Sequence, residues 1–169
     1  MDHPVVHPVF NWIWASPCQP KHKVFFWLLL KDRLSTRNIL RRKHMAIDSY
    51  NCVLCSHSIE ETSEHLFLSC YFAKQCSLLG IDTSDNSRFP EIASSFKVKL
   101  QSKFFMVAVI LMCWSIWTVR NDFIFNGVQP SVQNCRRKFF SELRLVQHRV
   151  KQSLQKSFEL WILSLSSDF

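Results

Sequence analysis

The sequence predicts a mainly α-helical protein, in which a small cysteine-rich helical module is followed by two long C-terminal helices. Apolar residues recur at intervals of three and four over long stretches, as they do along one face of a helix. No stretch alternates convincingly between apolar and polar residues as a strand would. A hydrophobic content of 47% with only two glycines argues against a disordered or low-complexity chain.

Two short helices are expected in the N-terminal third. The run KHKVFFWLLLK (residues 21–31) is apolar around much of its circumference, which predicts a largely buried helix. Ser35 or Thr36 is a suitable N-cap for a second helix, TRNILRRKHM (residues 36–45). This second helix would turn Leu40 inward and its arginines outward.

Two long helices are expected after the turn-rich segment GIDTSDNSRFP (residues 80–90), which predicts a linker. The first would cover about residues 90–125, with a break near residues 97–102, and end at Asn126-Gly127. The second would start at Pro130-Ser131 and bury one continuous stripe, made of Phe139, Leu143, Val146, Val150, Leu154, Phe158 and Trp161. The predicted organisation is a module over residues 10–79, a linker over residues 80–90 and a helical region over residues 91–169.

The most apolar segment is FFMVAVILMCWSIWTV (residues 104–119), which Arg120 closes. It falls short of the roughly 20 apolar residues that a membrane-spanning helix needs, so we expect a core helix and no membrane association. The N-terminus has neither the basic region nor the apolar region of a secretory signal. We therefore expect an intracellular protein, in the nucleus or cytoplasm, where clustered cysteines bind metal more often than they form disulfides.

The stretch CVLCSHSIEETSEHLFLSC (residues 52–70) holds three cysteines and two histidines. Cys52, Cys55, His65 and Cys70 form the pattern C-x2-C-x9-H-x4-C, whose ligand types and number suit one tetrahedral Zn²⁺. Four protein ligands leave no open position for a catalytic water, so the predicted zinc is structural.

The spacing of the last two ligands constrains the backbone around them. Thr62 is a suitable N-cap for a helix from residue 63 to about residue 79, with His65 in its first turn. On a continuous α-helix, His65 and Cys70 would lie about 140° apart. We therefore expect the helix to be distorted or broken near residues 68–70.

Other interpretations of the cluster stay open. His57 or Cys76 could replace one of the four ligands, or the cysteines could be free buried thiols. A redox dithiol lacks the βαβ context of thioredoxin-like motifs, and a cysteine nucleophile lacks an orienting third residue. The chain has no glycine-rich phosphate loop and no Asp-Asp pair for two-metal chemistry, so we do not expect an enzyme.

Positive charge is concentrated just before this cluster. Residues 21–44 carry a net charge of +7, residues 45–100 carry −3 and residues 101–169 carry +5. A basic block beside a slightly acidic module suits a polyanionic partner, although a solvated charged face would look the same. The candidate nucleic-acid-binding residues are Lys31, Arg33, Arg37, Arg41, Arg42 and Lys43.

Taken together, these motifs resemble the reverse-transcriptase zinc-binding domain of plant non-LTR retrotransposons and of ribonuclease H-like retroelement proteins. The likeness lies in IWASPCQPKHKVFFWLLLKDRLSTRNILRRKHM (residues 13–45) and in the cysteine cluster followed by YFAKQC, and covers about residues 10–77. WSIWTVRNDFIFNG (residues 114–127) is similar to the helix that often follows this domain. Leu28 and Ser77 depart from the family pattern, where an Arg and a Trp are common.

The resemblance implies a non-catalytic zinc module that binds RNA or its DNA copy beside a reverse transcriptase. Because the polymerase motifs are missing, the chain is expected to be a truncated or stand-alone remnant of such an element. The alternative is a zinc-stapled protein–protein interaction module without nucleic-acid binding. In that alternative the basic run is a solvated face, and the helix over residues 137–161 offers its apolar stripe to a partner.

Overall fold

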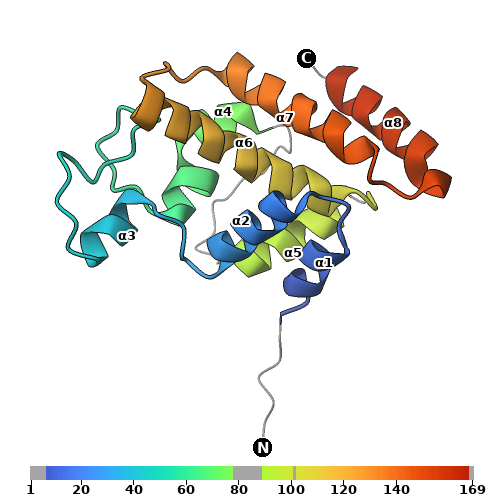
Figure 1. Ribbon diagram of the computed structural model, residues 1–169, viewed down its shortest axis with the longest axis horizontal. Helices are drawn as coiled ribbons and strands as arrows, with labels where there is room; N and C mark the ends of the chain where they lie inside the picture. The colour runs from blue at the N-terminus through green and yellow to red at the C-terminus, as the bar shows by residue number, and fades with distance from the viewer. Residues whose placement is uncertain (1–6, 78–88, 101, 168–169) are drawn as a thin grey trace, which may run out of the picture.

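The structure is a computed structural model that describes residues 7–77, 89–100 and 102–167. These residues form helices and connecting loops and contain no β-strand. The predicted mainly helical class, with a Cys/Cys/His/Cys cluster and long C-terminal helices, is confirmed. Figure 1 shows the arrangement: α6 runs through the middle, α7 lies above it, α2 and α5 lie below it, and α3 stands at one end.

The N-terminal part contains three short helices, α1 (Val9–Ala15), α2 (Pro20–Leu30) and α3 (Arg37–Arg42). Proline at the first position of α2 is favourable, because the N–H that it lacks would have no partner within the helix. In α3 the buried residue is Ile39, and Leu40 is only half-buried, which corrects the prediction. Arg37 and Arg41 face the loop over residues 49–60, so Ile39, about 200° around the helix from Arg37, points the other way.

After a long loop the chain forms a single π-helical turn, η1 (His65–Ser69), and a short helix, α4 (Tyr71–Cys76). The predicted linker, residues 80–90, lies almost wholly outside the described residues. The structure resumes with α5 (Phe89–Leu100) and α6 (Phe105–Asn126), which confirms the predicted break between them. Gly127 ends α6 in the left-handed conformation, with φ of 66°, as the Asn-Gly signal predicted.

The last predicted helix is wrong in one respect, since it is two helices, α7 (Val132–Gln147) and α8 (Gln152–Ser167), which fold back on each other. The apolar stripe nevertheless stays on one side, because the connection replaces about one helical turn and keeps Val146, Val150 and Phe158 all buried. A spacing pattern cannot distinguish one long helix from such a hairpin. Ser131 caps α7 by accepting a hydrogen bond from the Asn134 N–H at 3.0 Å.

One hydrophobic core joins the two ends of the chain. Its buried members come from α1, α2, η1 and α4 as well as from α5, α6, α7 and α8. The helix α6 is long and apolar enough to cross a membrane by length and composition, but most of its residues are buried against α2, α5 and α7. Burial therefore accounts for the apolar sequence of α6, and the cysteine-rich module packs directly on the C-terminal helices.

Candidate metal centre

Cys52 and Cys55 lie in a loop whose ends the backbone ties together. Asn51 and Glu60 form an antiparallel bridge, and the Cys52 N–H donates to the carbonyl of Ile59 at 2.8 Å. Within the loop Ser58 adopts a positive φ of 52°, which tightens the return of the chain. The loop thus presents the two sulfurs on one short, closed segment.

His65 and Cys70 come from the helical side of the site, and here the predicted distortion is confirmed. The Thr62 hydroxyl accepts a hydrogen bond from the His65 N–H at 3.0 Å, as expected for an N-cap. The next turn is π-helical, and the Cys70 N–H donates to the His65 carbonyl at 2.7 Å. Because a π-turn joins residues five apart, it brings together two positions that a regular α-helix separates.

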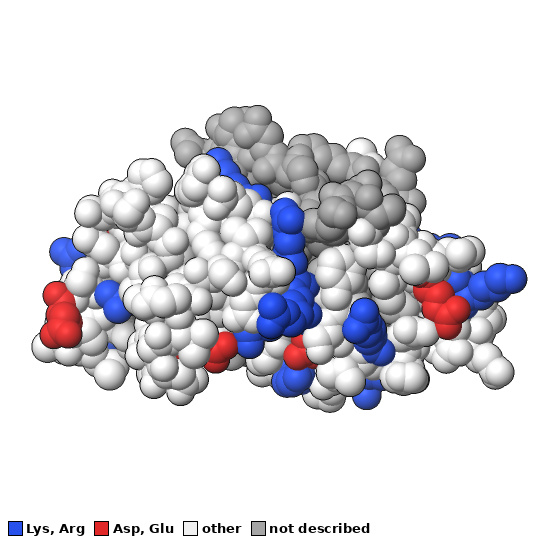
Figure 2. Space-filling model, turned by 90° about the horizontal axis from the view of Figure 1, so that it is seen from above, with Lys and Arg blue, Asp and Glu red and all other residues white. Residues whose placement is uncertain are grey.

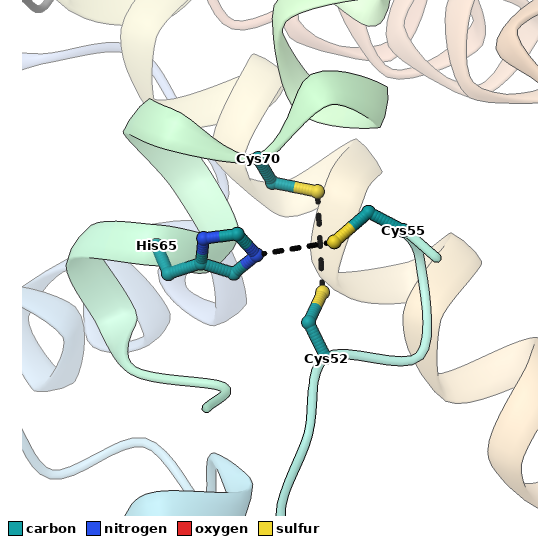
Figure 3. Close-up of side chains that lie close together, drawn as sticks. All are labelled: Cys52, Cys55, His65 and Cys70. Carbon is teal, nitrogen blue, oxygen red and sulfur yellow. Dashed lines mark hydrogen bonds between the residues drawn. The ribbon is translucent and has the colours of Figure 1, made fainter. Parts of the chain in front are cut away.

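The four ligand atoms converge in space, all within 4.8 Å of one another. Figure 3 shows the two loop cysteines facing His65 and Cys70 across a small gap. The Sγ atoms of Cys52 and Cys70 are 3.9 Å apart, and Cys55 Sγ lies 3.4 Å from His65 Nε2. Zn–S bonds of about 2.3 Å in a tetrahedron place neighbouring sulfurs about 3.8 Å apart, so these donor separations fit a zinc-sized ion.

Comparison with known protein families agrees with this geometry. Residues 2–76 match the family described as zinc-binding in reverse transcriptase. The match covers α1 to α4 and all four candidate ligands, and it confirms the resemblance drawn from the sequence for this part of the chain. Comparisons with curated proteins and with solved structures gave no match.

The surroundings of the Cys/Cys/His/Cys cluster orient its candidate ligands. Cys52, His65 and Cys70 are buried, while Cys55 is partly exposed. The Ser69 hydroxyl lies 3.2 Å from His65 Nδ1, the ring nitrogen that points away from the sulfurs. Such a contact on the far nitrogen fixes the orientation of a ligating imidazole and directs Nε2 into the site.

The pKa values of the two buried thiols, Cys52 and Cys70, are shifted in opposite directions. Interaction with the Cys52 thiol lowers the pKa of Cys70 to about 5, and the backbone N–H groups of Ala73 and Phe72 at the start of α4 add to this effect. The same hydrogen bond, together with burial, raises the pKa of Cys52. A lowered pKa favours the thiolate of Cys70, the form in which cysteine binds a metal.

Neither alternative ligand belongs to the group of converging atoms. His57 is exposed, and its ring lies 6.4 Å from that of Tyr71. Cys76 is fully buried in α4 and interacts with the thiol of Cys135 on α7, which raises the pKa of Cys76. Cys76 thus helps to join the zinc-binding domain to the C-terminal helices.

A buried ion pair, which the sequence analysis did not identify, links the cysteine-rich module to α6. Glu61 is fully buried, and both of its carboxylate oxygens accept hydrogen bonds from Arg120, at 2.6 and 3.3 Å. Glu61 also accepts from the Arg37 N–H at 3.0 Å and so satisfies the start of α3. The sequence feature that could have indicated this ion pair is Arg120, a charged residue at the end of the most apolar segment.

The six basic residues predicted to bind nucleic acid divide into two groups. Arg37 is partly buried, and its guanidinium donates to the Ser49 carbonyl at 2.6 Å, so it serves the structure of the loop. The other five are exposed on the side of α3 and the end of α2: Lys31, Arg33, Arg41, Arg42 and Lys43. Arg41 pairs with Glu60 at 3.4 Å and Arg42 with Asp32 at 2.9 Å.

Proposed function

We propose that Cys52, Cys55, His65 and Cys70 bind one Zn²⁺ ion with a structural role. The observation that carries this proposal is the convergence of three sulfurs and one imidazole nitrogen within 4.8 Å, in a segment of the zinc-binding family. When bound, the ion would fasten the loop over residues 51–60 to η1 and α4. Structural zinc of this kind contributes on the order of 10 kcal/mol of folding free energy.

We further infer that the module binds nucleic acid through the α3 surface, defined as Lys31, Arg33, Arg37, Arg41, Arg42 and Lys43. Five of these cations are exposed, and the carboxylates paired with them are Asp32 and Glu60. Arg33, Arg42 and Lys43 line a hollow of about 550 Å³ between the ends of α2 and α3. An excess of exposed positive charge around a hollow favours contact with phosphates.

The loop over residues 51–60 and the α3 surface are in direct contact, which supports a common role. Arg37 contacts Ser49 just before the loop, and Arg41 lies over the Tyr50 ring, 5.7 Å from its centroid, as well as beside Glu60. Of the three glutamates that could counter this surface, Glu61 is buried, Glu60 pairs with Arg41, and Glu64 is exposed. The zinc would thus hold in place the loop backbone that Arg37 and Arg41 contact.

In this proposal the protein is a non-catalytic, intracellular module of reverse-transcriptase origin that binds RNA or its DNA copy, with a reverse transcriptase as a further partner. Binding would be largely independent of sequence, because phosphate contacts position a nucleic acid without identifying its bases. Half-exposed Tyr50 adds a ring on which an unpaired base could stack.

Two measurements test the proposal in turn. Metal analysis of protein purified without chelator should give one zinc per chain, and Cys70→Ser should lose the zinc together with much of its helical circular dichroism. Folded wild-type protein without zinc would contradict the metal assignment. The affinity for labelled single-stranded RNA is then measured as a function of salt.

The RNA titration has a matched control on another face. Figure 2 looks down on the side that is uppermost in Figure 1, where α7 runs, and shows Lys and Arg side chains gathered in the middle of that face. The double variant Arg33→Gln/Lys43→Gln should lower the slope of log K against log salt by about 1.4. Arg137→Gln/Arg144→Gln on α7 should leave the slope unchanged, and the opposite result would move the binding surface to α7.

The protein-interaction alternative has one observation in its favour. The apolar stripe over residues 137–161 cannot contact a partner, because Phe139, Leu143 and Phe158 are fully buried in the core. On α8, however, Leu160 and Leu163 are 59% and 63% exposed. If neither double variant binds RNA less well than wild type, these leucines become the surface to mutate next.

A further inference from the structure

A second pocket lies far along the chain from the metal cluster, where three segments meet. The end of α1 and the residues that follow it, the first turn of α6, and the connection between α7 and α8 line a half-open pocket of about 580 Å³. This volume falls within the range of small-molecule sites. Arg149 holds two of the walls together, since its Nε donates to the Pro17 carbonyl at 3.1 Å.

The inner walls of the pocket are apolar and partly aromatic. Trp12 from α1 packs edge-on against Phe105 from α6, with ring centroids 5.5 Å apart. Met106, Val107 and Leu154 complete much of the remaining surface. Trp12 is only partly buried, so a planar ligand could contact part of its ring.

Positive charge surrounds these walls. Lys103, Arg149 and Lys151 line the pocket and are exposed, and no aspartate or glutamate is among its lining residues. Within the part of the chain that the structure describes, neither lysine forms an ion pair. Lys97 adds a fourth cation nearby, with its Nζ 4.6 Å from the centroid of the Trp12 ring. Three cations beside an apolar, partly aromatic surface favour an anionic ligand with an apolar body.

We propose that this pocket binds a small phosphorylated aromatic molecule of the nucleoside monophosphate class. A phosphate carries up to two negative charges and offers several acceptor oxygens, which matches three cations lining one pocket better than a single carboxylate does. A planar base matches the aromatic wall at Trp12 better than a flexible alkyl chain does. The site shares no residue with the metal cluster or the α3 surface, so it stands apart from the nucleic-acid proposal.

Isothermal titration of the full chain with AMP tests this site. AMP should bind once per chain, and Lys103→Gln/Lys151→Gln should weaken binding about tenfold, because an exposed charge pair contributes a factor of a few. Both lysines are exposed, so the variant should keep the wild-type circular dichroism and melting temperature. Lys156→Gln, an exposed lysine of α8 outside the pocket, should leave the affinity unchanged.

Comparison ligands decide the chemical class. Adenosine should bind at least about tenfold more weakly than AMP, since it lacks the phosphate that the cations would contact. The proposal is overturned if AMP gives no binding at millimolar concentration, or if the double variant binds AMP as well as wild type does. It is also overturned if laurate binds more tightly than AMP and loses affinity in the same variant, because the pocket would then prefer a fatty-acid-like anion.

Discussion

Replacing Arg120 by methionine should destabilise the protein severely, through a charge left behind in the core. Arg120 is 3% exposed, and it donates two hydrogen bonds to Glu61, which is fully buried. Arg120→Met keeps the apolar stem of the side chain but leaves the Glu61 carboxylate without its counter-ion. Breaking a buried pair in this way costs about 3–5 kcal/mol, a large part of the stability of a single domain.

The double variant Glu61→Met/Arg120→Met separates the charge effect from ordinary packing. With both charges removed, one remaining loss is the acceptor for the Arg37 N–H at the start of α3, a helix cap that contributes about 1 kcal/mol. The Arg120 guanidinium also loses its contacts with Asn121 and with the Trp117 ring. The double variant should therefore be more stable than either single variant. The double variant should lose at least about 2 kcal/mol less unfolding free energy than the two single variants lose in sum.

Urea denaturation followed by tryptophan fluorescence, at saturating zinc, measures these differences. Arg41→Met provides the matched control, because Arg41 and Glu60 form an ion pair at the surface, with 64% and 41% of the two side chains exposed. Loss of that pair should cost no more than about 1 kcal/mol. If Arg120→Met costs as little as Arg41→Met, or if the two single losses simply add, the coupling between the zinc module and α6 is refuted.

Three further outcomes are expected from other parts of the molecule. Ser69→Ala should weaken zinc affinity about tenfold, measured by competition with a chelator, because His65 Nδ1 loses its orienting contact. Cys76→Ala should leave the zinc content unchanged, since the thiol of Cys76 interacts chiefly with Cys135 and lies outside the group of converging ligand atoms. Burial lowers the pKa of His22 from 6.5 to about 4. Between these two pH values the unfolded chain therefore binds the proton more readily than the folded chain does. Stability should fall as the pH is lowered from 6.5 towards 4, and His22→Gln should flatten this part of the profile.

Each of these outcomes has its own contrary result. Ser56→Ala, in the exposed part of the metal loop, is the control for Ser69→Ala, and equal losses of affinity would dismiss the orienting role. A drop in zinc content in Cys76→Ala would return that cysteine to the ligand set. For His22, the nearby carboxylate of Glu142 opposes the effect of burial, but it also contacts Lys21 at 3.2 Å. A variant profile parallel to that of wild type would show that Glu142 keeps the histidine protonated.

Much of the candidate site followed from local sequence. The ligand spacing of Cys52, Cys55, His65 and Cys70 indicated one metal, and the five-residue step between the last two required a distorted helix, which the π-turn supplies. Thr62 and Gly127 also act as predicted, because capping depends on a few neighbouring backbone groups. These features are local, so a single sequence suffices to infer them.

The errors arose where distant segments decide the outcome. The stripe from Phe139 to Trp161 has the spacing of one helix, but only packing against the core determines that the chain turns back after His148. Ile39 replaces Leu40 as the buried residue of α3 because Arg37 and Arg41 are held by the loop over residues 49–60. Neither constraint is visible in the periodicity of the segment itself.

The sequence by itself determined the helical class, the zinc-type ligand pattern and the concentration of positive charge before it. Only the tertiary structure decided how the module is attached: Glu61 meets Arg120, 59 residues away, and Cys76 meets Cys135 across α4 and α7. It also decided that Arg37 supports the loop while Arg33 and Lys43 stay free to meet solvent. The physical reason is that spacing reports which residues share a local surface, whereas the partner of a buried charge or thiol depends on how remote helices pack.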